Sequence, residues 1–162
     1  MARPANPAAG KTDGDLVLTI TRIFDAAPAA VFRAWTDAAE IGRWIGPRSV
    51  KAEARSMEAR PSGRYEIAMH HESGKISTVR GSYRELKPAE RLVFTWAWDD
   101  ETGKPGPEML VTITFRALGK QTEMTLRHER FPSKEARDSH NTGWTGSFDK
   151  LAEALTGKPA RA

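Results

Sequence analysis

The chain contains no cysteine among its 162 residues. This absence excludes disulfide bonds, thiolate catalysis and cysteine-ligated zinc sites, and it is compatible with a reducing compartment. Long apolar runs are also missing, and no stretch approaches the roughly 20 residues that a membrane-spanning helix needs. Residues 1–14 lack the apolar core of a secretory signal. We therefore expect a cytoplasmic protein without a membrane span, whose residues 1–14 form a flexible leader.

A concentrated basic surface is missing too, although the isoelectric point calculated from the sequence is 9.6. The segments 1–14 and 157–162 carry three of the four formal positive charges, so the body between them is nearly balanced. A balanced body offers no basic footprint for phosphate groups, and we expect no nucleic-acid partner. The length suits one globular domain at 15–156, followed by a flexible tail at 157–162.

Recognisable catalytic and metal-binding motifs are absent. The sequence has no Gly-rich phosphate loop, no nucleophile elbow and no pair of histidines four residues apart. His70 and His71 are adjacent in a predicted strand, so they point to opposite faces and cannot readily share a metal ion. We interpret them as a solvated strand end, and the acidic run Asp99-Asp100-Glu101 as a hairpin tip. The sequence therefore predicts no metal site and no cofactor.

Strand-like segments separated by turn residues make up most of the chain. Leu16–Phe24 is rich in β-branched residues, and Pro28–Trp35 has apolar residues at helical spacing. Asp37, with Glu40 three residues later, resembles a capping box and predicts a second short helix that reaches Trp44. The further strand-like runs are Val50–Met57, Tyr65–His71, Ile76–Leu86, Leu92–Trp98, Met109–Ala117 and Thr122–Arg130. This succession predicts an antiparallel meander.

The last two strand-like runs predict a specific register, because Gly119-Lys120 suits a two-residue hairpin turn. The predicted pairs on one face are Phe115 with Met124, Ile113 with Leu126, and Val111 with His128. The predicted pairs on the other face are Arg116 with Glu123, and Thr114 with Thr125. The preceding strand agrees, since it places Leu92, Phe94, Trp96 and Trp98 on one face at period two. Three consecutive strands thus present one large apolar surface.

A C-terminal helix is the natural cover for that surface. It is predicted to begin at Pro132-Ser133 and to end at Gly157. Its apolar stripe consists of His140, Trp144, Phe148, Leu151 and Leu155. Gly143 and Gly146 interrupt the helix at a cost of about 1 kcal/mol each relative to alanine. Such glycines indicate a close approach by the sheet, a bend, or room for a ligand.

Four segments occur in a specific order along the chain. They are Ala26–Asp37 (AAPAAVFRAWTD), Gly81–Trp96 (GSYRELKPAERLVFTW), Thr122–His128 (TEMTLRH) and Gly143-Trp144. Together they resemble the activator of heat shock protein 90 ATPase (Aha) homologues, a family within the START-like, or SRPBCC (Bet v 1-like), superfamily, over Leu16–Leu155. The resemblance implies an α+β helix-grip fold. In that fold two short helices follow the first strand, and a curved antiparallel sheet of about six or seven strands wraps around a long C-terminal helix over a cavity.

Candidate ligand-binding residues follow from the predicted apolar face together with the cavity that the resemblance implies. They are Trp96, Trp98, Phe115, Met124 and His128 from the sheet, Trp144 and Phe148 from the helix, and Trp44, Tyr65 and Tyr83 at the mouth. The alternative interpretation is that these side chains simply fill the core, as aromatic residues commonly do. Arg80 or Arg84 would enter the cavity if the strand Ile76–Leu86 presented its other face, a choice that the sequence leaves open.

His128 is the candidate with the most chemical potential, because a neutral imidazole on the apolar face could orient a ligand or accept its proton. The alternative is a buried histidine bonded to a backbone carbonyl or to a nearby side chain. No neighbouring acid or nucleophile is identifiable, so no catalytic residue is predicted. His140, in the helix, is a weaker candidate than His128.

Three functions remain, in this order. The first is binding of a small apolar or aromatic ligand between the sheet and the C-terminal helix. The second is a protein-interaction domain, linked to a chaperone by the resemblance and so to the stress response. The third is a cyclase- or hydrolase-like enzyme that uses the same cavity, with His128 as acid or base. The first strand or exposed aromatic rims could also support a homodimer.

Overall fold

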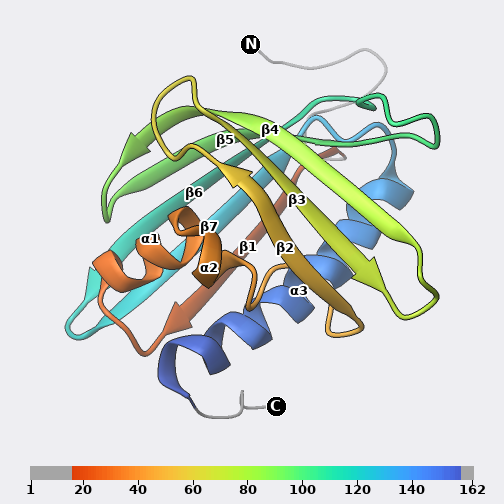
Figure 1. Cartoon of the computed structure of the whole chain (residues 1–162). Helices are drawn as coiled ribbons and strands as arrows, with labels where there is room; N and C mark the ends of the chain where they lie inside the picture. The colour runs from red at the N-terminus through yellow and green to blue at the C-terminus, as the bar shows by residue number, and fades with distance from the viewer. Residues whose placement is uncertain (1–15, 158–162) are drawn as a thin grey trace.

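The computed structural model describes residues 16–157, and it has the predicted helix-grip architecture. One seven-stranded antiparallel sheet curves around a long helix, and two short helices follow the first strand (Figure 1). The strands are β1 (Leu18–Phe24), β2 (Val50–Met57), β3 (Arg64–His71), β4 (Ile76–Lys87), β5 (Arg91–Trp98), β6 (Met109–Leu118) and β7 (Gln121–Glu129). The helices are α1 (Pro28–Thr36), α2 (Ala38–Ile41) and α3 (Lys134–Thr156).

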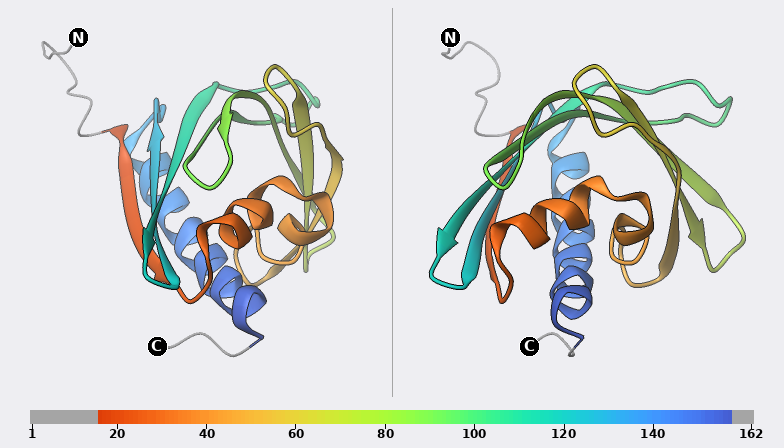
Figure 2. Two further views of the ribbon diagram at one scale, coloured as in Figure 1. Left: turned by 90° about the vertical axis from the view of Figure 1, so that its left-hand side faces the viewer. Right: turned by 60° about the vertical axis from the view of Figure 1, so that its left-hand side comes forward.

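The strands follow the order β1-β7-β6-β5-β4-β3-β2, so β1 and β2 are the two edges. Figure 2 shows the sheet as an arch, with α3 running along its concave side and α1 and α2 closing one end. The predicted leader at 1–14, and the predicted tail apart from Gly157, lie outside the described residues. Among residues 16–157, no helix is long and apolar enough to cross a membrane.

Local capping rules explain where the helices begin and end. The Asp37 side chain accepts a hydrogen bond of 3.0 Å from the backbone N–H of Glu40, which starts α2 as the capping box predicted. Ser133 caps α3 in the same way, with 3.1 Å to the N–H of Ala136. Gly157 ends α3 with a φ of 72°, a left-handed conformation that glycine adopts without a steric penalty. α2 ends at Ile41, earlier than the predicted Trp44.

The hairpin of β6 and β7 confirms the predicted register. Leu118 pairs with Gln121 across the Gly119-Lys120 turn, and the pairing continues through Phe115 with Met124. The predicted opposite-charge pair forms on the outer face, where Arg116 Nη2 lies 2.9 Å from Glu123 Oε1. The alternation of apolar and polar residues therefore fixed the inner face of this hairpin correctly.

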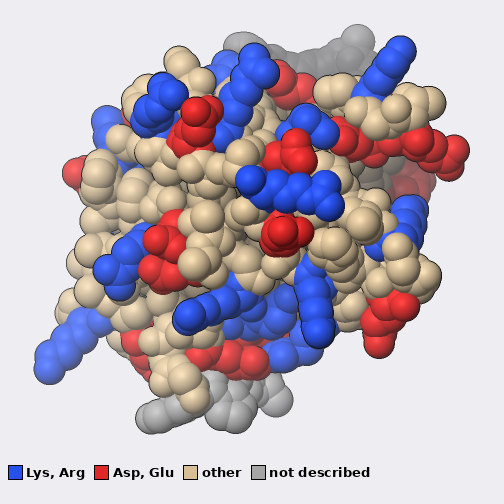
Figure 3. Space-filling view, in the orientation of Figure 1, with Lys and Arg blue, Asp and Glu red and all other residues tan. Residues whose placement is uncertain are grey.

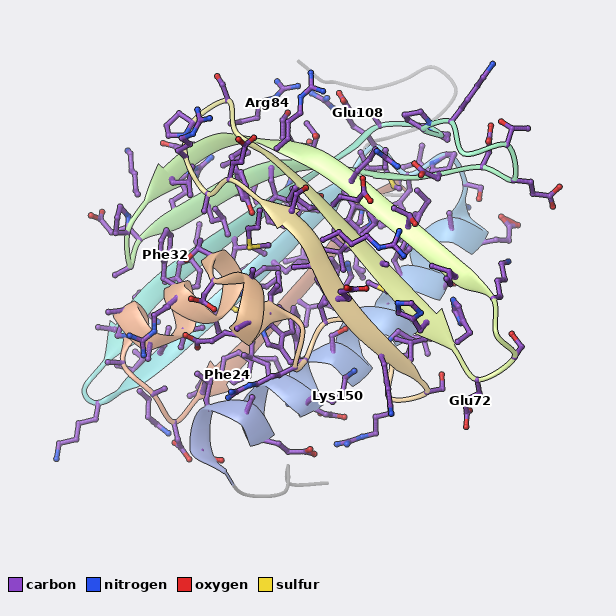
Figure 4. All side chains as sticks on the ribbon, in the orientation of Figure 1. Phe24, Phe32, Glu72, Arg84, Glu108 and Lys150 are labelled. Atoms are coloured by element: carbon purple, nitrogen blue, oxygen red, sulfur yellow. The ribbon has the colours of Figure 1, made fainter. Side chains whose placement is uncertain are left out.

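The strand β4 turns Val79 and Tyr83 toward the core, which resolves the face that the sequence left open. Arg80 lies on the outer face, where its guanidinium contacts Asp99 at 2.5 Å and Glu66 at 3.1 Å. Arg84 is also outside, 3.7 Å from Glu108, and Figure 4 shows the two side by side. Neither arginine enters the interior of the sheet.

The outer surface carries both signs of charge. Figure 3 shows lysines and arginines interspersed with aspartates and glutamates over the visible face. This mixture agrees with the nearly balanced body of the sequence. Such a surface provides no single basic patch on the visible face for a phosphate backbone.

Candidate ligand cavity

A cavity of about 280 Å³ lies between the sheet and the N-terminal half of α3. The sheet contributes Met69, His71, Ser77, Trp96 and Trp98, and α3 contributes Ser139, His140, Gly143, Trp144 and Ser147. The segment between α2 and β2 contributes Ile45, Gly46 and Pro47. Two lining residues, His71 and Ser77, flank the β3–β4 turn, which contains Glu72, labelled in Figure 4.

The cavity has an apolar floor and a more polar rim. Ile45, Met69, Trp96 and Trp144 are each at most 4% exposed, so they form the floor. The side chains of His71, Ser77, Trp98 and His140 are half-buried, and they line the same space closer to solvent. None of the lining residues is Asp, Glu, Lys or Arg. A neutral wall of this kind favours apolar ligands and penalises buried charge.

Three tryptophans give the cavity its shape. The rings of Trp96 and Trp98 meet at 90° with centroids 5.7 Å apart, which makes a right-angled corner. Trp144 from α3 packs against Trp96 with centroids 5.0 Å apart. The three indole rings therefore present both flat faces and a ring edge to the cavity, an arrangement suited to a planar aromatic ligand.

Trp98 and His140 are fixed by a chain of hydrogen bonds. The Trp98 indole N–H donates to His140 Nε2 at 3.0 Å, while His140 Nδ1 lies 2.7 Å from the carbonyl of Ala136. Nε2 must therefore accept and Nδ1 must carry the proton, which defines a neutral imidazole. Burial lowers the pKa of His140 and so favours this state. The sequence favours His128 over His140 as a ligand-binding candidate, but His140 is the histidine that lines the cavity.

His128 lies on the apolar face opposite Val111, as predicted, but it does not line the cavity. It is fully buried, its Nδ1 accepts a 3.0 Å hydrogen bond from the Trp144 indole, and its ring stacks on Phe131 with centroids 4.2 Å apart. Burial, and to a lesser extent the neighbouring His140, lowers the pKa of His128 to about 2. This environment matches the interpretation of a buried histidine bonded to a nearby side chain, and it gives no support to an acid or base role in the cavity.

A short segment at the cavity mouth is tied to α3. The backbone N–H of Gly46 donates to Ser147 Oγ at 2.8 Å, and Lys150 Nζ reaches the Pro47 carbonyl at 3.2 Å. Lys150 of α3 is labelled in Figure 4. Gly46 has a φ of 92°, and a Cβ there would lie 2.6 Å from the Val50 side chain. The sharp turn at Gly46 therefore places Ile45 in the floor and Pro47 beside α3.

The two helix glycines have different surroundings. A Cβ at Gly146 would lie 3.6 Å from Pro47 Cα, so this glycine is where the mouth segment approaches the helix. A Cβ at Gly143 would meet nothing within 4 Å, because that position faces the cavity. The sequence left a close approach, a bend or room for a ligand as explanations for these glycines. Gly146 is a position of close approach, and Gly143 is a position with open space beside it.

Seven of the ten predicted ligand residues lie outside this cavity lining. Phe115 packs on Phe32 of α1, and Met124 accepts a hydrogen bond from the Trp35 indole at 3.3 Å. Phe148 and Trp44 are fully buried in the core, where the Trp44 indole donates to the Ala34 carbonyl. His128 lies behind Trp144. The remaining two, Tyr65 and Tyr83, line a separate space of about 10 Å³, too small for a ligand.

Met69, His71 and Ser77 are lining residues that the sequence did not single out. The signal for the first two was the alternation of Tyr65, Ile67, Met69 and His71 along one strand, which places them on one face. His70 and His71 do point to opposite faces, as expected. His71 is the half-buried last residue of β3, and its Nε2 lies 2.8 Å from Ser77 Oγ at the cavity rim, a contact that the interpretation as a strand end did not include.

The curved sheet around the long C-terminal helix defines a helix-grip protein. The sequence model of the activator of Hsp90 ATPase homolog 1-like proteins matches residues 25–156, and the chain belongs to this family. That finding confirms the resemblance seen in the sequence. A comparison with curated proteins gives no match.

Several solved structures share the fold. An AHSA1 protein from Silicibacter pomeroyi is 29% identical, with a TM-score of 0.77, and the match covers 86% of this chain and 96% of that one. A protein from Chromobacterium violaceum is 26% identical, with a TM-score of 0.80 and the same coverage. A protein from Arthrobacter aurescens is 22% identical, with a TM-score of 0.82 over 91% of this chain and 90% of that one. The last similarity concerns the fold alone.

Proposed function

We propose that this protein binds a small apolar or aromatic molecule between its sheet and α3. The observation that carries the proposal is the cavity of about 280 Å³ whose floor is apolar and whose tryptophans Trp96 and Trp98 meet at a right angle. Ligand sites are commonly concave, mostly apolar and largely pre-formed. The volume is near the lower end of the usual range of roughly 300 to 1,000 Å³, so the ligand is a molecule of one or two rings.

The five tryptophans provide a direct test, because each indole N–H gives its own signal in a nitrogen–proton NMR spectrum. Trp96, Trp98 and Trp144 line the cavity, whereas Trp35 and Trp44 do not. Titration with 2-naphthol should shift the first three signals in a saturable manner and move the other two less. Equal movement of all five, or no movement at millimolar concentration, would contradict the proposal.

A blocking variant tests the location of the ligand. Gly143→Leu places a side chain where a Cβ meets nothing within 4 Å, so it fills the cavity without a backbone clash. We expect it to fold normally and to lose 2-naphthol binding. Thr142→Leu adds the same side chain at the adjacent exposed position of α3 and is the matched control. Retention of wild-type binding by Gly143→Leu would show that the ligand lies elsewhere.

A protein-interaction function is the second candidate, and the family description supports it by naming an activator of the Hsp90 ATPase. The test is the ATPase rate of a purified chaperone of the Hsp90 class with and without this protein. A saturable rate increase would favour this candidate. The same assay with Gly143→Leu would then show whether the cavity takes part, because that substitution leaves the outer surface unchanged.

A further inference from the structure

Several polar groups around the cavity already have their hydrogen bonds, although the buried Trp96 indole N–H has none within residues 16–157. The Trp98 indole and both nitrogens of His140 are partnered, as described above. Ser147 Oγ donates to the Gly143 carbonyl at 2.8 Å and accepts from Gly46 N at the same distance. These groups fix the shape of the wall. They have little capacity left for recognising a ligand.

His71 and Ser77 differ from these groups. They lie on the inner face at the end of β3 and the beginning of β4, and Ser77 pairs with the floor residue Met69 across the two strands. His71 Nε2 is 2.8 Å from Ser77 Oγ, and His71 Nδ1 makes no hydrogen bond within residues 16–157. A hydroxyl and an imidazole together can both donate and accept, whichever tautomer is present. The pair therefore retains hydrogen-bonding capacity at the rim, directly above an apolar floor.

The two cations beside Pro47 do not offer a partner for an ionic ligand. Arg48 is paired with Glu153, and the Lys150 ammonium is bound to the Pro47 carbonyl. Neither cation is among the lining residues. An ion placed on the apolar floor would lose its hydration without gaining an opposite charge, which is strongly unfavourable.

We propose that His71 and Ser77 make this cavity selective for an uncharged, planar aromatic molecule that carries a hydroxyl group. The aromatic rings lie against Trp96 and Trp144 on the floor, and the hydroxyl reaches the His71–Ser77 pair at the rim. A hydroxyl group both donates and accepts, so it complements this pair in either tautomer. The proposal rests on the binding function proposed above and specifies its ligand class.

Three probes of nearly equal shape test the ligand class by isothermal titration calorimetry at pH 7. They are 2-naphthol, 2-methylnaphthalene and 2-naphthoate, which place a hydroxyl, a methyl or a carboxylate at the same ring position. We expect 2-naphthol to bind about tenfold more tightly than 2-methylnaphthalene, the effect of one or two net hydrogen bonds. The anion 2-naphthoate should bind at least about tenfold more weakly than 2-naphthol.

Variants assign the selectivity to the pair. Ser77→Ala and His71→Phe should each reduce the preference for 2-naphthol over 2-methylnaphthalene to about twofold or less, and leave 2-methylnaphthalene affinity within about twofold of wild type. Ser73→Ala removes an exposed serine from the same hairpin and should leave the preference unchanged. Retention of a tenfold preference by Ser77→Ala and His71→Phe would overturn the assignment.

The outcomes separate this proposal from the binding function. If both uncharged probes bind wild type equally well, or if 2-naphthoate binds best, the ligand class is wrong while the binding function stands. If none of the three probes binds, both proposals fail together. If 2-naphthol is preferred and the preference depends on His71 and Ser77, both are supported.

Discussion

The burial of His128 predicts a specific dependence of stability on pH. The pKa of this imidazole falls from 6.5 to about 2 on folding, chiefly because burial penalises the charged form. Between these two values the unfolded chain binds a proton that the folded chain does not. The stability is therefore complete above pH 6.5 and is lost as the pH falls toward 2. The loss attributable to His128 is about 2 kcal/mol between pH 6.5 and 4.5, and about 6 kcal/mol in total.

The variant His128→Phe isolates this effect, because phenylalanine keeps an aromatic ring but cannot be protonated. At pH 7.5 it should be less stable than wild type by about 1 to 3 kcal/mol, since the Trp144 indole loses its acceptor. Toward pH 4.5 wild type loses its His128 contribution and the variant does not. The two free energies of unfolding should therefore converge, or cross, over this range.

Urea unfolding followed by tryptophan fluorescence at half-unit steps between pH 4.5 and 7.5 measures the difference. Leu126→Ala is the matched control, because it alters a buried residue of the same strand that has no titratable group. Its stability gap to wild type should stay constant with pH. A gap for His128→Phe that also stays constant would refute the reasoning, because it would mean that His128 is protonated equally in the folded and unfolded chains.

Three further substitutions have outcomes set by local geometry, each measurable by urea unfolding. Gly81→Ala should destabilise the fold by about 2 kcal/mol or more, because its Cβ would lie 2.0 Å from the Thr95 carbonyl oxygen. A loss in the free energy of unfolding below about 1 kcal/mol would contradict this close approach of β4 and β5. Ser147→Ala should cost about 1 to 3 kcal/mol, since it leaves the buried N–H of Gly46 without its acceptor, and an unchanged stability would show that this hydrogen bond is dispensable. Gly143→Ala should instead stabilise by up to about 1 kcal/mol through helix propensity, and a loss would show that the position is more crowded than the cavity implies.

The sequence predicted the features of the fold that depend on neighbouring residues. Ser133 and Gly157 set the ends of α3, and the Gly119-Lys120 turn set the register of β6 and β7. Each follows from a local rule that operates over a few residues. The inner face of these strands followed in turn, because alternation within one strand determines which side chains share a face.

The lining of the cavity could not be predicted in the same way, because it depends on which helix covers which part of the inner face. Phe115 and Trp96 both point inward, but α1 covers the first through Phe32, while the second faces α3. No periodicity distinguishes a side chain that meets a helix from one that meets open space. Alternation predicts Trp96 and Trp98 as lining residues, and for the same reason it predicts Phe115, which packs on α1 instead.

The open space at Gly143 is itself informative, because glycine is required there by neither backbone conformation nor packing. Gly81 shows the opposite case, in which a Cβ would collide with the backbone of the next strand. An alanine at 143 would fit and would favour the helix by about 1 kcal/mol. The chain therefore gives up helix stability at a position that lines the cavity. The glycine at this position leaves the space beside α3 open, which is the space in which the ligand is proposed to bind.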